Sequence, residues 1–206
     1  PFLMRERFPT EEEQRAIYRE QLETFAPRPV TMRTLDVGGD KALPYFPIRE
    51  ENPFLGWRGI RVTLDHPEIF LAQVRAMLKA SAGLDNLRIM LPMISNTQEL
   101  DEALALLTRA REELREEGWT IATPQVGVMV EVPAAVYQAG ELARRVDFLS
   151  VGSNDLTQYL LAVDRNNARV AALYHAFHPA VLQALQAVVR AAHDVGRPVS
   201  ICGELA

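Results

Sequence analysis

The segment from Gly127 to Tyr159 limits the possible folds of this chain more than any other stretch. Two short apolar runs, 127–132 and 147–153, lead to the carboxylates Glu131 and Asp155 and then to residues suited to starting a helix. Buried parallel strands show this pattern, and α/β proteins carry their chemistry where such strands end. The spacing predicts that Glu131 and Asp155 lie at the ends of neighbouring strands and can share one divalent cation.

A structural role for the same carboxylates is left open by the spacing. Asp155 can cap the helix that follows it, and Pro133 points to a helix start directly after Glu131.

The rest of the chain alternates between strand and helix in the same way. Strands are predicted at 30–37, 87–93, 127–132, 147–152 and 198–202. Helices are predicted at 11–25, 67–78, 97–117, 134–144 and 179–195, the first with a capping box between Thr10 and Glu13 and the second capped by Asp65. This order indicates a parallel sheet with crossover helices, either a (β/α)₈ barrel or an open doubly wound sheet.

Composition fits one globular domain over residues 1–206, because 48% hydrophobic residues in a chain of this length can bury a sizeable core. A net charge of -5 without a basic stripe argues against nucleic acid as a partner. The sequence has no apolar run of membrane-spanning length, so no membrane partner is expected. A single cysteine suits a reducing compartment, and we expect a cytoplasmic location.

Arginines and one cysteine are the other candidates for chemistry. Arg33, Arg58 and Arg165 lie at or just beyond predicted strand ends, and converging guanidinium groups would bind phosphate and carboxylate. An arginine is more often part of a solvated salt bridge. Cys202 ends the last predicted strand, where a thiol could deliver a proton to carbon, although a buried cysteine is usually just a small apolar side chain.

Two further segments, one rich in glycine and one in proline, each have more than one possible role. Gly38 and Gly39 could bring the backbone close to a phosphate or could simply form a turn. Residues 42–57 are too irregular for a helix or strand, and a loop of this length is often functional or packed as a lid.

Five segments in order resemble the C-terminal domain of Enzyme I of the phosphotransferase system. They are residues 33–41, 51–58, 127–133, 154–159 and 202–204, and the resemblance covers nearly the whole chain. Residues 61–71 resemble the nitrogen-related paralogue more closely than the sugar-branch enzyme. The rival families are pyruvate phosphate dikinase and phosphoenolpyruvate synthase, which share the metal pair and the Cys-Gly motif, but the block from Asn52 to Arg58 favours Enzyme I.

The resemblance implies a (β/α)₈ TIM barrel of which this chain is a fragment, lacking the first strands and the last. It implies phosphoenolpyruvate and Mg²⁺ as ligands, with Glu131 and Asp155 on the metal. The phosphate and carboxylate would be held by Arg33, Arg58, Asn154 and Arg165. Cys202 would protonate the departing enolate to give pyruvate.

The implied activity is that of a phosphoenolpyruvate-protein phosphotransferase. The phosphoryl group would pass to a histidine on a separate N-terminal domain and then to a histidine-bearing carrier protein. We expect a homodimer, and we expect the fragment alone not to complete phosphotransfer. A non-catalytic module that senses phosphoenolpyruvate and dimerises is the alternative from a different class.

Overall fold

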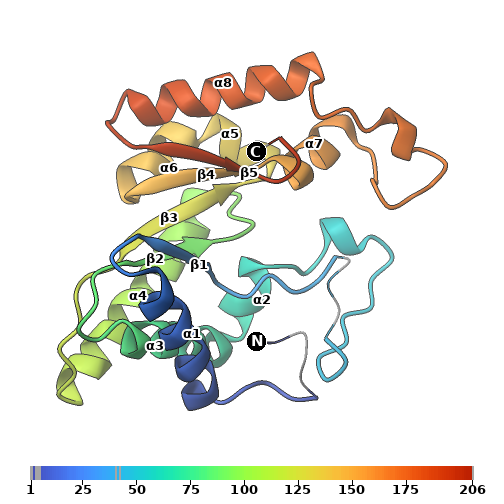
Figure 1. The fold of residues 1–206 in the computed structure, drawn as a ribbon. Coiled ribbons are helices and arrows are strands. Elements are labelled where there is room, and N and C mark those ends of the chain that lie inside the picture. The colour runs from blue at the N-terminus through green and yellow to red at the C-terminus, as the bar shows by residue number, and fades with distance from the viewer. Residues whose placement is uncertain (1, 3–5, 40, 42, 206) are drawn as a thin grey trace. The chain divides into compact units, whose positions relative to one another are not determined.

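A computed structural model describes residues 2, 6–39, 41 and 43–205 (Figure 1). The chain forms two compact units, the first made of residues 1–90 with 101–125 and the second of residues 91–100 with 126–206. Strands and helices alternate along the described chain, which confirms the predicted α/β class. No helix in the described ranges is both long and apolar enough to cross a membrane.

The first unit contains two parallel strands and the helices that follow them. Strand β1 (Val30–Arg33) pairs with β2 (Leu87–Leu91). Helix α1 (Glu11–Phe25) packs against α3 (Pro67–Ala80). The capping box predicted for α1 is present, since Thr10 Oγ1 accepts from Glu13 N at 3.2 Å and Glu13 Oε2 accepts from Thr10 N at 2.7 Å. The turn η1 (Pro53–Leu55) and helix α2 (Ile60–Asp65) complete the segment between β1 and α3.

Strand β1 is shorter than the predicted strand over 30–37. Its ladder with β2 continues as far as Thr34, whose N–H donates to Met90 O at 3.0 Å. The next N–H, that of Leu35, donates instead to the side chain of Gln73 on α3 at 2.8 Å. A helix side chain therefore replaces the neighbouring strand as the hydrogen-bond acceptor, and the chain leaves the sheet at this point.

The long segment between β1 and α2 is anchored by aromatic side chains. Phe46 packs against Phe8 and Trp57, with ring centroids 5.5 and 5.7 Å apart. These rings lie against a buried cluster that includes Leu35 and Val37. The predicted irregular loop is therefore packed onto the unit over much of its described length.

The second unit is built on three parallel strands. Strand β4 (Phe148–Gly152) pairs with β3 (Gln125–Val130) on one side and with β5 (Val199–Cys202) on the other. The helical elements of this region are α5 (Pro133–Tyr137), α6 (Ala139–Arg145), α7 (Ser153–Leu161), η2 (Ala171–Leu173) and α8 (Pro179–His193). Helix α8 packs against α5, α6 and α7 and against β4 and β5 (Figure 1).

Register and side-chain alternation divide this sheet into two faces. Val130 pairs with Val151, and Val151 pairs with Ile201, so these apolar residues share one face. The opposite face carries the alternate residues Met129, Ser150, Gly152, Ser200 and Cys202. At the strand ends, Gly152 and Cys202 therefore lie on the face opposite to Val151 and Ile201.

Three predictions about helices are wrong. The helix predicted over 134–144 is divided at Gln138, whose N–H closes a short turn on Ala135 O at 3.2 Å and whose side chain donates to Ser95 O at 2.9 Å. Helix α2 was not predicted, because it has six residues and no side-chain cap. Asp65 does not cap α3; it ends α2 and accepts from Trp57 Nε1 at 2.6 Å.

Helix α4 (Thr97–Glu116) begins and ends as predicted. Asn96 Oδ1 accepts from Glu99 N at 2.9 Å, which satisfies one of the helix's first N–H groups. Gly118 follows the helix with a φ of 88°, the left-handed conformation that glycine adopts at low cost.

Candidate functional site

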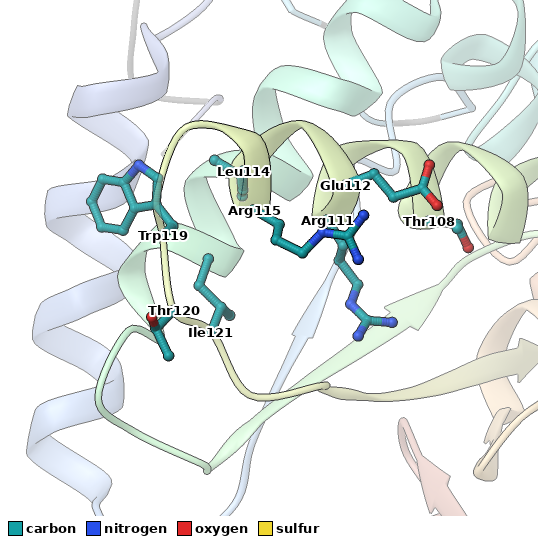
Figure 2. A pocket seen from close by; sticks show the side chains of 8 residues that line it. All are labelled: Thr108, Arg111, Glu112, Leu114, Arg115, Trp119, Thr120 and Ile121. Atoms are coloured by element: carbon teal, nitrogen blue, oxygen red, sulfur yellow. The ribbon is translucent and has the colours of Figure 1, made fainter.

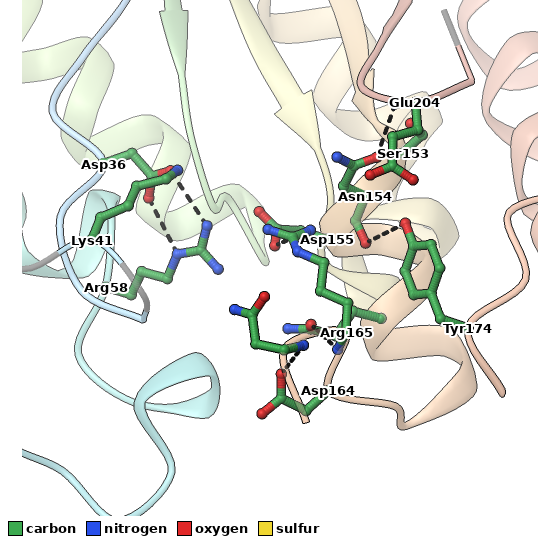
Figure 3. A network of polar contacts seen from close by, with 12 residues as sticks. Asp36, Lys41, Arg58, Ser153, Asn154, Asp155, Asp164, Arg165, Tyr174 and Glu204 are labelled. Atoms are coloured by element: carbon green, nitrogen blue, oxygen red, sulfur yellow. Dashed lines mark hydrogen bonds and ion pairs between the residues drawn. The ribbon is translucent and has the colours of Figure 1, made fainter. Parts of the chain in front are cut away.

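A buried carboxylate, Asp36, is contacted by three cationic side chains of the first unit, two of which are drawn in Figure 3. Arg58 is 0% exposed and donates through Nε and Nη2 to the two oxygens of Asp36, both at 3.3 Å. Lys41 Nζ also donates to Asp36, and Arg33 Nη1 lies 3.4 Å from it. Two predicted ligand-binding residues, Arg33 and Arg58, are therefore brought together by one carboxylate.

The neighbouring cations determine the ionisation of Asp36. Burial acts to raise the pKa of Asp36, but the positive charges of Arg58, Lys41 and Arg33 outweigh it and the pKa lies below its ordinary value. Asp36 is therefore ionised at neutral pH, where it can bind the side chains of Arg58, Lys41 and Arg33. Arg33, Asp36 and Lys41 also line a pocket of about 540 Å³. Cationic side chains in the wall of a pocket suit a ligand that carries phosphate or carboxylate groups.

The turn at Gly38 explains how Lys41 and Arg58 reach the same carboxylate. Gly38 and Lys41 exchange backbone hydrogen bonds at 3.0 and 3.1 Å, and Gly38 has a φ of 103°. A Cβ at Gly38 would lie 2.6 Å from Trp57 O, so only glycine lets the two segments approach this closely. The turn role considered for these glycines accounts for Gly38.

The Glu131 side chain, directly after β3, is held by a backbone hydrogen bond and fits beside a glycine. The side chain is buried, and Oε1 accepts from Met93 N at 2.8 Å. Met93 has a φ of 58°, an uncommon conformation for a residue other than glycine and one that occurs at functional sites. A Cβ at Gly152 would lie 2.8 Å from Glu131 Oε2, so the absence of a side chain there leaves room for the carboxylate.

Asp155 lies in the first turn of α7 and is also buried. Arg165 Nη1 lies 3.4 Å from Asp155 Oδ1, and Arg165 N donates to Gln158 Oε1 at 3.0 Å. The N-cap of α7 is Gly152, and that of α5 is Val132. The alternative in which Asp155 caps its helix is therefore wrong. Helix α5 begins at Pro133, as predicted, and Glu131 Oε1 bonds to Met93 N.

The chain after β5 is attached to the start of α7 (Figure 3). Ser153 Oγ donates to Cys202 O at 2.8 Å, and Asn154 Oδ1 accepts from Glu204 N at 3.0 Å. Tyr174 OH donates to Asn154 O at 3.3 Å. The bond from Glu204 N fixes the orientation of the Asn154 amide, whose Nδ2 group is its hydrogen-bond donor.

The residues predicted for chemistry thus form two sets, each within one unit. The first set holds Arg33 and Arg58, and the second holds Glu131, Asp155, Asn154, Arg165 and Cys202. The sequence did not identify the partners of these residues as part of the site. Two of them, Asp36 and Lys41, lie within the segment 33–41 that carries the resemblance. Met93 and Ser150 gave no local signal, because their contacts come from distant parts of the sequence.

The available ligand side chains decide which metal ion this region could bind. The described residues contain no group of three or more His, Cys, Asp and Glu side chains placed to hold a metal. Two buried carboxylates on neighbouring strand ends still fit Mg²⁺, which is usually bound by one or two carboxylates together with the oxygens of a phosphate ligand and water.

A separate pocket of about 410 Å³ lies along the end of α4 (Figure 2). Its lining includes Arg111, Arg115, Trp119 and Ile121, and Arg111 Nη2 donates to Thr123 Oγ1 at 2.6 Å. Its loop residues precede β3 in the chain, whereas the predicted site residues follow strand ends. It contains none of the residues predicted for chemistry.

Comparison with known proteins gives matches over the whole chain. The family model described as "PEP-utilising enzyme, PEP-binding domain" matches residues 1–206. An Escherichia coli protein named phosphoenolpyruvate-dependent phosphotransferase system is 57% identical over 100% of this chain and 28% of its own length. A Haemophilus influenzae phosphoenolpyruvate-protein phosphotransferase is 49% identical over 100% of this chain and 36% of its own length.

The chain therefore spans about a third of the curated relatives it matches. Among solved structures, the malate synthase of Haloferax volcanii in its pyruvate and acetyl-CoA ternary complex has a TM-score of 0.54. That match has 15% sequence identity and covers 94% of this chain and 45% of the other. At this identity it shows a likeness of fold.

Proposed function

Because this chain belongs to the family of PEP-utilising enzymes, as their PEP-binding domain, we propose that it binds phosphoenolpyruvate with Mg²⁺ and forms pyruvate in a phosphoenolpyruvate-protein phosphotransferase. The observation that carries the proposal is the ends of three adjacent parallel strands. They lead to Glu131, to the Ser153–Asp155 turn and to Cys202. The residue types needed to bind a metal, to bind phosphate and to donate a proton therefore follow the ends of successive strands.

We assign the binding of the negatively charged groups of phosphoenolpyruvate to three arginines and one asparagine. The phosphate and carboxylate oxygens would be held by Arg33, Arg58, Asn154 and Arg165. The grouping of Arg33, Lys41 and Arg58 around Asp36 supports this assignment, because phosphoenolpyruvate carries several negative charges. Arg165 would exchange its 3.4 Å contact with Asp155 for the ligand's phosphate.

Glu131 and Asp155 would hold Mg²⁺, which when bound neutralises charge on the phosphoryl group and on the enolate oxygen. Met93 N–H keeps Glu131 in place through Oε1, which leaves Oε2 as the oxygen beside Gly152. Such support of a ligating carboxylate by a backbone donor is usual for metal sites.

Cys202 would act as the acid. When the phosphoryl group moves to the acceptor histidine, the P–O bond of phosphoenolpyruvate breaks and a P–N bond forms. The electron pair left on oxygen gives an enolate, and the Cys202 S–H bond breaks as its proton adds to the methylene carbon. Pyruvate and a thiolate result, and the thiolate regains its proton from water.

The acceptor histidine, on a separate domain, and the histidine-bearing carrier protein belong to the proposal for the whole protein. So do a closed (β/α)₈ barrel, a homodimer and a cytoplasmic location. The nitrogen-related branch is supported by residues 61–71. The phosphotransferase names of the relatives favour this function over a dikinase or synthase.

Calorimetry with phosphoenolpyruvate, in the presence and absence of Mg²⁺, tests the proposal. We expect Mg²⁺ to tighten binding, and we expect Glu131→Gln to remove at least about ten-fold of that gain while keeping the shape of the side chain. Glu141→Gln, at an exposed carboxylate on α6, is the matched control and should behave as the unchanged protein does. An affinity for phosphoenolpyruvate that changes neither on adding Mg²⁺ nor in Glu131→Gln would contradict the metal assignment.

A further inference from the structure

The Cys202 thiol has two polar neighbours on strand β4. Its Sγ–H donates to Val151 O at 3.4 Å, and Sγ accepts from Ser150 Oγ at 3.7 Å. Ser150 is 5% exposed and pairs in register with Ser200, two residues before Cys202, so both side chains lie on the same face. A buried hydroxyl is thus aimed at the sulfur from the neighbouring strand.

The backbone around the thiol is held in one position. Ser153 Oγ and Asn154 Oδ1 bond to the chain on either side of Gly203, which has a φ of 104°. A Cβ on Gly203 would lie 2.5 Å from Ser153 Oγ and 2.7 Å from Asn154 Oδ1. The loop is therefore packed directly on the start of α7, which keeps the thiol within reach of Ser150.

The two neighbours favour different forms of the sulfur. A carbonyl oxygen such as Val151 O accepts a hydrogen bond only while the thiol keeps its proton. A hydroxyl can donate to the sulfur in either form, and such a bond is stronger when the acceptor is charged. The Ser150 hydroxyl is therefore the neighbour that can still bond to the sulfur once the proton has left.

We propose that Ser150 is a positioning residue that stabilises the Cys202 thiolate formed when the thiol gives its proton to the enolate carbon. This inference rests on the proposed function in assigning the acid role to Cys202. Ser150 does not touch the substrate; it acts through the sulfur, and its hydroxyl keeps its own proton throughout.

Alkylation of Cys202 by iodoacetamide tests the interaction, because the chain has a single cysteine and only the thiolate reacts. We expect Ser150→Ala to slow alkylation about five-fold at neutral pH and to leave the rate at strongly alkaline pH unchanged, where the thiol is ionised in both proteins. Ser150→Thr, which keeps a hydroxyl, should restore the rate. Ser200→Ala, at an exposed serine on β5, is the control. Equal rates at neutral pH for Ser150→Ala and the unchanged protein would overturn the inference.

Turnover and binding separate this inference from the proposed function. In the whole protein with its phosphoryl acceptor, Ser150→Ala should lower kcat for pyruvate formation about ten-fold with KM unchanged. An unchanged kcat alongside loss of turnover in Cys202→Ala would overturn the role of Ser150 and leave the acid role standing. Full turnover in Cys202→Ala would overturn the acid role and the inference with it. An absence of phosphoenolpyruvate binding would overturn the proposed function, and the alkylation comparison would still report on the contact between Ser150 and the thiol.

Discussion

Replacing Asp36 with asparagine removes the negative charge at the centre of the cationic cluster and keeps the shape of the side chain. Arg58 is 0% exposed, so its guanidinium group cannot turn to water when the carboxylate is lost. Removing one partner of a buried ion pair costs about 3–5 kcal/mol. The amide oxygen of asparagine still accepts one hydrogen bond, and the side chains of Lys41 and Arg33 are 29% and 35% exposed, so they can be solvated. We therefore expect a loss of about 3 kcal/mol in the free energy of unfolding.

Urea unfolding followed by tryptophan fluorescence measures this loss, since Trp57 and Trp119 both belong to the unit that contains Asp36. With an m-value of about 2–3 kcal/mol/M, the midpoint should fall by about 1 M. Asp85→Asn, at an exposed aspartate before β2, is the matched control and should change the free energy of unfolding by less than about 0.5 kcal/mol.

The pH dependence provides a second check on the same substitution. Because the folded pKa of Asp36 lies below its unfolded value, the stabilisation is fully present above the unfolded pKa, about 4, and is lost as the pH falls through the folded pKa. The difference between the unchanged protein and Asp36→Asn should be largest at neutral pH and shrink below about pH 4. Equal stabilities at pH 7, or a difference that widens in acid, would refute the reasoning.

Two further substitutions test how the site is supported. Gly152→Ala places a methyl group 2.8 Å from Glu131 Oε2 and should weaken Mg²⁺-dependent phosphoenolpyruvate binding by more than about ten-fold in calorimetry. Gly140→Ala, where the nearest atoms are 4.0 Å away, is its control, and equal binding by the two variants would count against a tight Glu131 site. Gln73→Leu leaves the buried Leu35 N–H without its acceptor and should cost about 1–3 kcal/mol in urea unfolding, whereas an unchanged midpoint would show that this bond is dispensable.

Local patterns in the sequence were sufficient for the elements whose signals are also local. The capping box at Thr10, the helix start at Thr97 and the apolar runs of β3 and β4 each depend on residues within a few positions of one another, and each is confirmed. The end of β1 was missed because it depends on Gln73, 38 positions away. The division of the helix at Gln138 was missed because its side chain bonds to Ser95, 43 positions away.

The same distinction applies to the site. Glu131, Asp155 and Cys202 could be selected because each follows an apolar strand, which is a local signal. The residues that control them, Met93 and Ser150, reach them across 38 and 52 positions. Nothing in the residues beside Met93 requires a positive φ, so the bond that holds Glu131 appears only when the chain is folded.

Strand register is the physical link between the core of the second unit and its chemistry. Leu149 and Val151, which are buried, share one face of the sheet with the partly buried Val199 and Ile201, and this alignment requires the observed pairing of β4 with β5. That pairing also places Ser150 and Cys202 on the opposite face, with Gly152 beside Glu131. A slip of one residue in β5 would turn Cys202 toward the apolar face and Ile201 toward the polar one. The hydrophobic pattern therefore selects which thiol, hydroxyl and carboxylate meet, although none of these polar groups contributes to the pattern.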